Sequence, residues 1–190
     1  MENTIEQNYF LQSQKDATTQ IILTVSKRLQ EVVEGSFVNY PLGSCYLVGH
    51  CMSELLKKWD YESRVVTGEL TLRTRNGKVV RYGHIRKNGE INVGYYHTWC
   101  EVNICDESFI VDPSLKYIFS ALKTYHSLKI ISSVPEILIS SAMKTNNYQY
   151  SEKDSLAKYS NENLSKLSIE TIDNIIDAVR FYSTAEQETH

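Results

Sequence analysis

The sequence predicts a single α+β domain in which helices pack on an antiparallel β-sheet. First, 190 residues give room for one domain with one hydrophobic core. Second, apolar residues recur at helical spacing near both ends of the chain. Third, the stretch between them alternates apolar and polar residues and contains Asn-Gly pairs, which accept the backbone conformation of tight hairpin turns. These three patterns together favour a sheet flanked by helices.

Helices are predicted where apolar residues return every three or four positions. The first covers about 18–34 and the second 45–59, with Ser44 placed to cap the second helix and Cys45 in its first turn. A third amphipathic helix is predicted over 169–181. Helices therefore stand before and after the predicted sheet.

Strands are predicted where the pattern alternates and turn residues bound it. The segments are 64–74, 79–86, 93–104, 108–112 and 128–134. Turns at 75–78 and 87–90 join the first three, and Pro113 closes the fourth, so we expect an antiparallel meander. Residues 115–122 fit a short helix or a loop, and 140–151 form a polar connection.

The domain organisation follows from these elements. Residues 1–16 are a polar lead-in, 17–183 form the single domain, and 184–190 are a polar tail. No internal repeat or linker divides the chain.

The composition excludes several functional classes. A formal net charge of -3 lacks the basic excess of a nucleic-acid-binding domain, so we expect no nucleic acid. No apolar run reaches the roughly 18–20 residues that span a bilayer, and residues 1–15 do not resemble a secretory leader. We therefore expect a soluble, cytoplasmic protein with no membrane partner, and leave delivery elsewhere by a dedicated system open. Four cysteines are too few for a disulfide scaffold, so reduced thiols are expected.

One cysteine stands where a thiol becomes nucleophilic. Cys45 opens a predicted helix, and unpaired N–H groups at a helix start favour the thiolate. Such a nucleophile needs a base and a group that orients the base. His97 and Asp112 lie on consecutive predicted strands and suit these roles. Simple register separates them by about three residues, or roughly 10 Å, so we expect a bulge or strong twist to join them.

Three blocks around these residues resemble the transglutaminase-like superfamily of papain-related cysteine enzymes. They are Gly-Ser-Cys-Tyr at 43–46, His-Thr-Trp-Cys-Glu-Val at 97–102 and Val-Asp-Pro-Ser at 111–114, in the family's order. The passage at 59–68 is similar to the family's route from the nucleophile helix into the sheet. The resemblance covers about 40–116, the motif core, and implies a transglutaminase-like or papain-like fold.

The resemblance also implies a catalytic triad without a cofactor. Cys45 is then the nucleophile, His97 the base and later the acid, and Asp112 the group that orients His97. The family passes through a thioester or other acyl-enzyme. Its members differ in whether water resolves this intermediate, as in proteases and deamidases, or an amine, as in cross-linking enzymes and acyltransferases. The substrate expected here is a polypeptide or another amide. Tyr46, where many relatives have Trp, and Thr98, where Ala is common, leave the substrate preference open.

Other residues near the triad are candidates for binding. Backbone N–H groups at Cys45 and Tyr46 could hold an oxyanion, with the Asn39 side chain as a further donor. Three aromatic residues beside His97 are candidates for a substrate wall: Tyr95, Tyr96 and Trp99. Core packing explains aromatic residues on a strand equally well.

The remaining cysteines and histidines give no metal motif. His50 beside Cys51 suggests a metal site, but the spacings to Cys45, Cys100 and Cys105 do not form two close ligand pairs. We expect no metal, and read Cys51, Cys100 and Cys105 as packing residues.

A stretch rich in Lys and Arg suggests an alternative function, the binding of a protein partner without catalysis. Residues 64–90 contain seven Lys or Arg against two acidic residues. A solvated hairpin face explains this balance, and an acidic partner is the sharper interpretation. In that case the chain is a non-catalytic protein-binding module on the same scaffold.

Overall fold

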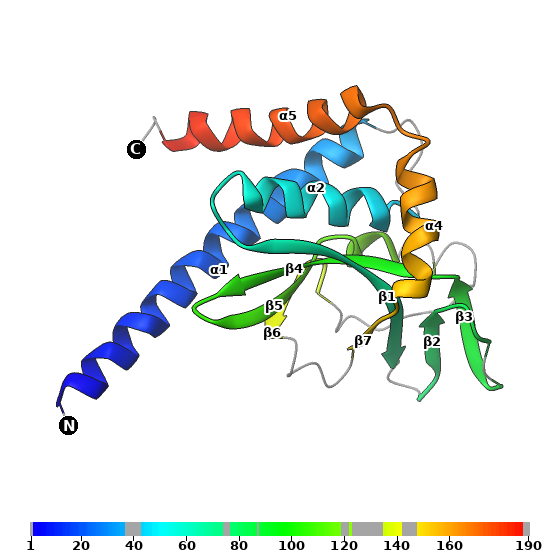
Figure 1. Cartoon of the computed structure of the whole chain (residues 1–190), viewed down its shortest axis with the longest axis horizontal. Helices are drawn as coiled ribbons and strands as arrows, with labels where there is room; N and C mark the ends of the chain where they lie inside the picture. The colour runs from blue at the N-terminus through cyan, green and yellow to red at the C-terminus, as the bar shows by residue number, and fades with distance from the viewer. Residues whose placement is uncertain are drawn as a thin grey trace.

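A mostly antiparallel sheet with helices against it is the frame of the computed structural model (Figure 1). The predicted α+β class is confirmed. The structure describes residues 2–36, 43–73, 77–86, 88–118, 122, 135–141 and 148–187, with side chains described between 14 and 181. The Leu128–Val134 strand predicted above lies outside these residues.

Helices flank the sheet in chain order. Their bounds are α1 Glu2–Ser36, α2 Cys45–Lys57, α4 Asp154–Leu164 and α5 Ile169–Gln187. Residues 115–118 are also helical. Helix α1 includes the expected polar lead-in; no Gly or Pro interrupts the chain before Gly35, and about half of the lead-in residues are good helix formers such as Glu, Gln, Leu and Lys. Its first half extends away from the sheet (Figure 1), so apolar periodicity marked only the half that packs.

Among the described residues, the strands form one seven-stranded sheet. Their bounds are β1 Ser63–Arg73, β2 Val79–Tyr82, β3 Glu90–Gly94, β4 His97–Ile104, β5 Glu107–Asp112, β6 Leu138–Ser141 and β7 Tyr148–Glu152. The order is β3-β2-β1-β4-β5-β6, and β7 also pairs with β1.

Two expectations about the sheet were wrong. Strand β3 runs parallel to β2, so the turn at 87–90 does not close an antiparallel hairpin. The strand expected over 93–104 is broken at Tyr95 and Tyr96 into β3 and β4, which lie at separate places in the sheet. The alternating pattern continues across this break, which is why periodicity alone does not reveal it. Helix α4 and strands β6 and β7 were also not predicted.

Both faces of the sheet are covered. Helices α1, α2 and α5 pack with the Cys100 and Val102 face of β4, forming one core. The opposite face carries a second core that includes Trp99, Leu70 and Leu115. The site described below lies at the start of β4, next to the amino end of α2.

Strand β1 organises the site because it pairs with three other strands. Ser63–Gly68 pairs with β4, Leu70–Arg73 with β2, and Gly68–Leu72 with β7. Leu70 pairs with Tyr82 and with Tyr150, so β2 and β7 flank β1 on opposite edges. Gly68 is required here, since a Cβ at this position would lie 2.1 Å from the carbonyl oxygen of Ser151.

Candidate active site

Cys45 is the first residue of α2, and a close helix–strand contact sets its position. Gly43 has a positive φ of 77° and turns the chain into the helix. Further along α2, Gly49 faces β4, where a Cβ would lie only 3.1 Å from Thr98 Cγ2. The glycine therefore lets α2 approach the strand that begins with His97. Ser44 precedes the helix as expected, but its side chain makes no capping hydrogen bond.

His97 and Asp112 form a fully buried pair. The imidazole Nε2 lies 2.6 Å from Asp112 Oδ2, and neither residue is exposed. The β4–β5 ladder pairs Cys100 with Val111 without a register shift, so Asp112 continues opposite Trp99, two residues from His97. Residues two apart on neighbouring strands share a face and lie within reach of long side chains. The offset is therefore two residues instead of the expected three, the β4–β5 ladder shows no bulge, and a diagonal contact joins the pair.

Four hydrogen bonds hold the Asp112 carboxylate. Besides His97 at Oδ2, the backbone N–H and the hydroxyl of Ser114 donate to Oδ1 at 3.0 and 2.7 Å. The Tyr150 hydroxyl donates to Oδ2 at 2.7 Å. A buried carboxylate held by several donors is fixed in place and keeps its charge.

The pair is an imidazolium and a carboxylate near neutral pH. Burial acts to lower the pKa of His97, but the charge and hydrogen bond of Asp112, assisted by Cys45, raise it above its ordinary value. Burial acts to raise the pKa of Asp112, but the charge of His97 and the bonds from His97, Ser114 and Tyr150 lower it. In both cases the partner outweighs the burial.

The second imidazole nitrogen, Nδ1, is the one that can interact with Cys45, because Nε2 already bonds Asp112. His97 Nδ1 is buried, and no described residue gives it a hydrogen bond of ordinary geometry. The Cys45 sulfur is nevertheless close enough to raise the pKa of the imidazole by hydrogen bonding and charge. Hydrogen bonds between catalytic groups often reach ordinary geometry only when substrate binds. The structure thus brings Cys45, His97 and Asp112 together in that order.

Aromatic rings enclose the imidazole. The ring centroids of Tyr82, Tyr150 and Trp99 lie 5.7, 6.1 and 6.3 Å from that of His97. Trp99 is 1% exposed. It therefore cannot form a substrate wall, as the sequence suggested, and it supports the His97 ring from the core. Alternation along β4 does not reveal that Trp99 is buried, because both faces of this strand are covered.

A small cavity opens beside the thiol. It has a volume of about 30 Å³, and its lining includes the amino end of α2 together with Tyr82, His97, Ser114, Tyr117 and Ile118. Roughly 10–15 Å³ is enough for one water molecule. The cavity therefore admits a carbonyl oxygen or a water molecule beside Cys45, but not a whole ligand.

The other predicted binding residues are placed differently. Tyr46 is half-buried, and burial is the main cause that raises its pKa. Tyr96 is also partly buried, and its hydroxyl accepts a hydrogen bond from Asn163 at 2.6 Å. Tyr95 is 65% exposed. Asn39 lies outside the described residues.

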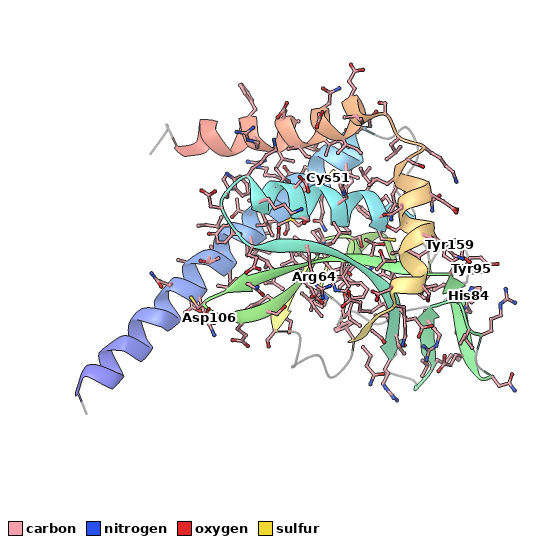
Figure 2. The ribbon with its side chains drawn as sticks, in the orientation of Figure 1. Cys51, Arg64, His84, Tyr95, Asp106 and Tyr159 are labelled. Carbon is pink, nitrogen blue, oxygen red and sulfur yellow. The ribbon has the colours of Figure 1, made fainter. Side chains whose placement is uncertain are left out.

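An exposed aromatic cluster surrounds Tyr95. His84 stacks on Tyr159 at 6.4 Å and lies 6.2 Å from Tyr95, while Tyr96 stacks on Tyr159 at 6.4 Å. Figure 2 shows Tyr95, His84 and Tyr159 together near α4. These residues come from three separate segments of the chain, so their gathering is a tertiary feature.

The basic stretch does not form a uniform free surface. Arg64 is bound by Glu101 and Glu152, each at 2.6 Å. Arg81 is buried and bound by Glu69 and Glu90. Two of the arginines expected to attract an acidic partner are therefore already paired with glutamates of this chain. Within the described ranges, no three His, Cys, Asp or Glu side chains are grouped to hold a metal.

Sequence reasoning missed three residues at the site. Tyr150 was placed in a polar connection, although it belongs to β7 and contacts Asp112 across 38 positions. Ser114 follows Asp112 by two positions, a spacing at which a carboxylate commonly accepts hydrogen bonds from the backbone or a short hydroxyl side chain. This spacing could have indicated the contact. Tyr82 was predicted only as a strand residue, and no local pattern indicated where its ring would lie.

Comparisons with known proteins add information about the fold alone. No model of a protein family and no curated protein matches the chain. A crystal structure described as genomics APC5867 is similar, with a TM-score of 0.57 and 9% identity, over 83% of this chain and 76% of that one. In the described part of the chain, no helix is long and apolar enough to cross a membrane. The chain therefore shares an α+β architecture with a solved protein whose description names no activity.

Proposed function

We propose that this protein is a cysteine enzyme that acts on amide bonds through an acyl-enzyme at Cys45. The observation that carries the proposal is the buried His97–Asp112 pair, whose free Nδ1 faces the thiol at a helix start. A buried ion pair contributes little net stability compared with apolar packing. A functional role gives a reason for its presence next to an accessible nucleophile.

The chemistry follows from the order of the groups. The Cys45 thiolate adds to the amide carbonyl carbon, and the carbonyl electron pair moves to oxygen. When the C=O bond reforms, the C–N bond breaks, and the leaving amine takes the proton held at His97 Nδ1. Water then attacks the thioester carbonyl and gives a proton to His97 Nδ1; the C–S bond breaks, which releases the acid and restores the Cys45 thiolate beside the imidazolium. Asp112 keeps the imidazole oriented throughout.

The cavity favours a polypeptide substrate over a small cofactor-sized one. Sites for small molecules usually enclose about 300–1,000 Å³, whereas the cavity beside Cys45 has about 30 Å³. Only the reacting carbonyl fits inside, so the rest of the substrate lies along the surface. A transglutaminase-like peptidase, amidase or deamidase is the function proposed on this basis, with amine transfer as the alternative fate of the acyl group.

The test starts with the thiol and needs no known substrate. Cys45 is partly exposed and Cys105 is exposed, whereas Cys51 and Cys100 are buried, so Cys105→Ala removes the competing thiol and provides the background. We expect iodoacetamide to alkylate Cys45 faster than a free thiol peptide at pH 6, and His97→Ala to abolish the difference.

The reaction is then identified with peptide mixtures. Mass spectrometry distinguishes backbone cleavage, conversion of glutamine to glutamate, and incorporation of an added primary amine. We expect one of these products with wild-type protein and none with Cys45→Ala. Equal product with Cys45→Ala would show that the activity lies elsewhere.

A further inference from the structure

Tyr82 is aimed at the candidate site by an irregularity in the sheet. The parallel β2–β3 ladder pairs Arg81 with Asn92, but Tyr82 with Gly94, so one residue of β3 is skipped. Such bulges redirect the side chain beside them and occur often at active sites. The Gly83 N–H donates to the Gly94 carbonyl at 2.8 Å, which holds the irregular turn.

The space for the ring depends on a glycine. A Cβ at Gly94 would lie 2.8 Å from Tyr82 Cδ1, so any larger residue there would displace the ring. With Gly94, the ring packs at 5.7 Å from the His97 ring and lines the cavity beside Cys45. Tyr82 therefore forms part of the wall of the same cavity as the amino end of α2.

The Tyr82 hydroxyl keeps its proton and donates a hydrogen bond to none of the residues that the structure describes. Burial raises its pKa, and negative charge at Cys45 and Asp112 raises it further, so both groups lie within electrostatic reach. No hydrogen bond links its hydroxyl to any residue that the structure describes. Tyr150, in contrast, uses its hydroxyl on Asp112. A free donor beside a nucleophile is suited to a charge that appears only during the reaction.

We propose that Tyr82 is a catalytic residue whose hydroxyl donates a hydrogen bond to the oxyanion formed when the Cys45 thiolate adds to a carbonyl. The inference rests on the proposed function and extends it. The new S–C bond places negative charge on the former carbonyl oxygen inside the cavity, between the first N–H groups of α2 and the Tyr82 hydroxyl. Tyr82 keeps its proton, and no proton needs to leave it when the C=O bond reforms.

The test uses an aldehyde, because its adduct mimics this intermediate without requiring the natural substrate. Addition of the Cys45 thiol to [1-13C]acetaldehyde forms an S–C bond and converts the carbonyl to a thiohemiacetal, which 13C NMR detects. In the Cys105→Ala background, the signal from Cys45 is the one lost on Cys45→Ala. We expect Tyr82→Phe to weaken adduct formation roughly 10- to 100-fold, as for loss of a hydrogen bond to a charged group.

Alkylation separates this role from a structural one. Iodoacetamide displaces iodide and creates no oxyanion, so Tyr82→Phe should alkylate at Cys45 within about twofold of wild type. Tyr148→Phe is the matched control, a buried tyrosine on the same sheet, and should leave both reactions unchanged. With a substrate in hand, Tyr82→Phe should lower kcat by about 10²–10³ with little change in KM.

The outcomes separate the two proposals. Wild-type adduct formation in Tyr82→Phe would overturn this inference and leave the proposed function standing. A parallel loss of adduct formation and alkylation would also overturn it, because Tyr82 would then only support the site. A wild-type Cys45 that neither alkylates faster than a free thiol nor forms the adduct would overturn both.

Discussion

Replacing Asp112 with asparagine should reverse how the stability of the fold depends on pH. The substitution keeps the shape of the side chain but removes the charge that faces His97 Nε2 at 2.6 Å. In the wild type, the pKa of His97 is raised in the folded state. Its stabilising contribution is therefore complete below the unfolded value of about 6.5 and is lost as pH rises through the folded pKa.

The magnitude follows from proton linkage. Between pH 6.5 and the folded pKa of His97, the folded chain binds one proton more than the unfolded chain, so wild-type stability falls by up to about 1.4 kcal/mol per pH unit. In Asp112→Asn, burial remains and acts to lower the pKa of His97. The unfolded chain then binds the extra proton below pH 6.5, so stability rises with pH there. At pH 6.5 the variant should be less stable by about 3–5 kcal/mol, as expected for a broken buried pair.

Urea denaturation at pH 5.5, 6.5, 7.5 and 8.5 measures both effects. The difference between wild type and variant is the quantity of interest, because titrations elsewhere in the chain cancel. It should be largest near or below pH 6.5 and shrink as the pH rises. Asp177→Asn is the control, since that carboxylate is 70% exposed and its difference should be small and flat. A difference for Asp112→Asn that grows toward alkaline pH would refute the reasoning.

Three further substitutions test how the site is held. Tyr150→Phe removes a donor to Asp112 and should cost about 1.5–3 kcal/mol in urea denaturation, whereas Tyr95→Phe, on an exposed ring, should cost nothing measurable. Gly49→Ala gains about 1 kcal/mol of helix propensity, but the added methyl group would press against Thr98 in buried β4. We therefore expect a net loss in thermal stability and slower alkylation of Cys45. A gain in both would contradict the packing argument. Gly68→Ala forces β7 away and should destabilise by about 3 kcal/mol or more; an unchanged melting temperature would count against the β1–β7 contact.

The predicted elements that the structure contains are those encoded locally. Apolar periodicity identified the packed half of α1, the helix that begins at Cys45 and most of α5, because each buries one face. Turn residues and alternation identified β1, β2 and β5 to within a few residues. In β4, alternation puts His97 and Cys100 on opposite faces, as in the structure, but it does not show that both faces are buried.

The pairing of strands that are distant in the chain could not be predicted from the sequence. Strand β7 is short and polar, and it becomes a strand because β1 offers it an edge at Gly68–Leu72. The parallel β2–β3 pair likewise depends on partners rather than on a local period. The contacts of Tyr150 and Tyr82 with His97 arise from these pairings.

By itself the sequence determined an α+β chain and selected Cys45, His97 and Asp112 as the residues to examine. Helix starts, strand ends and hydrophobic period are properties of neighbouring residues, and they can be read from order along the chain. Only the tertiary structure decided that His97 meets Asp112 diagonally, that Trp99 is support rather than surface, and that Tyr82 faces the cavity. These features depend on register, glycine contacts and burial between segments far apart in sequence, which are set when the sheet assembles.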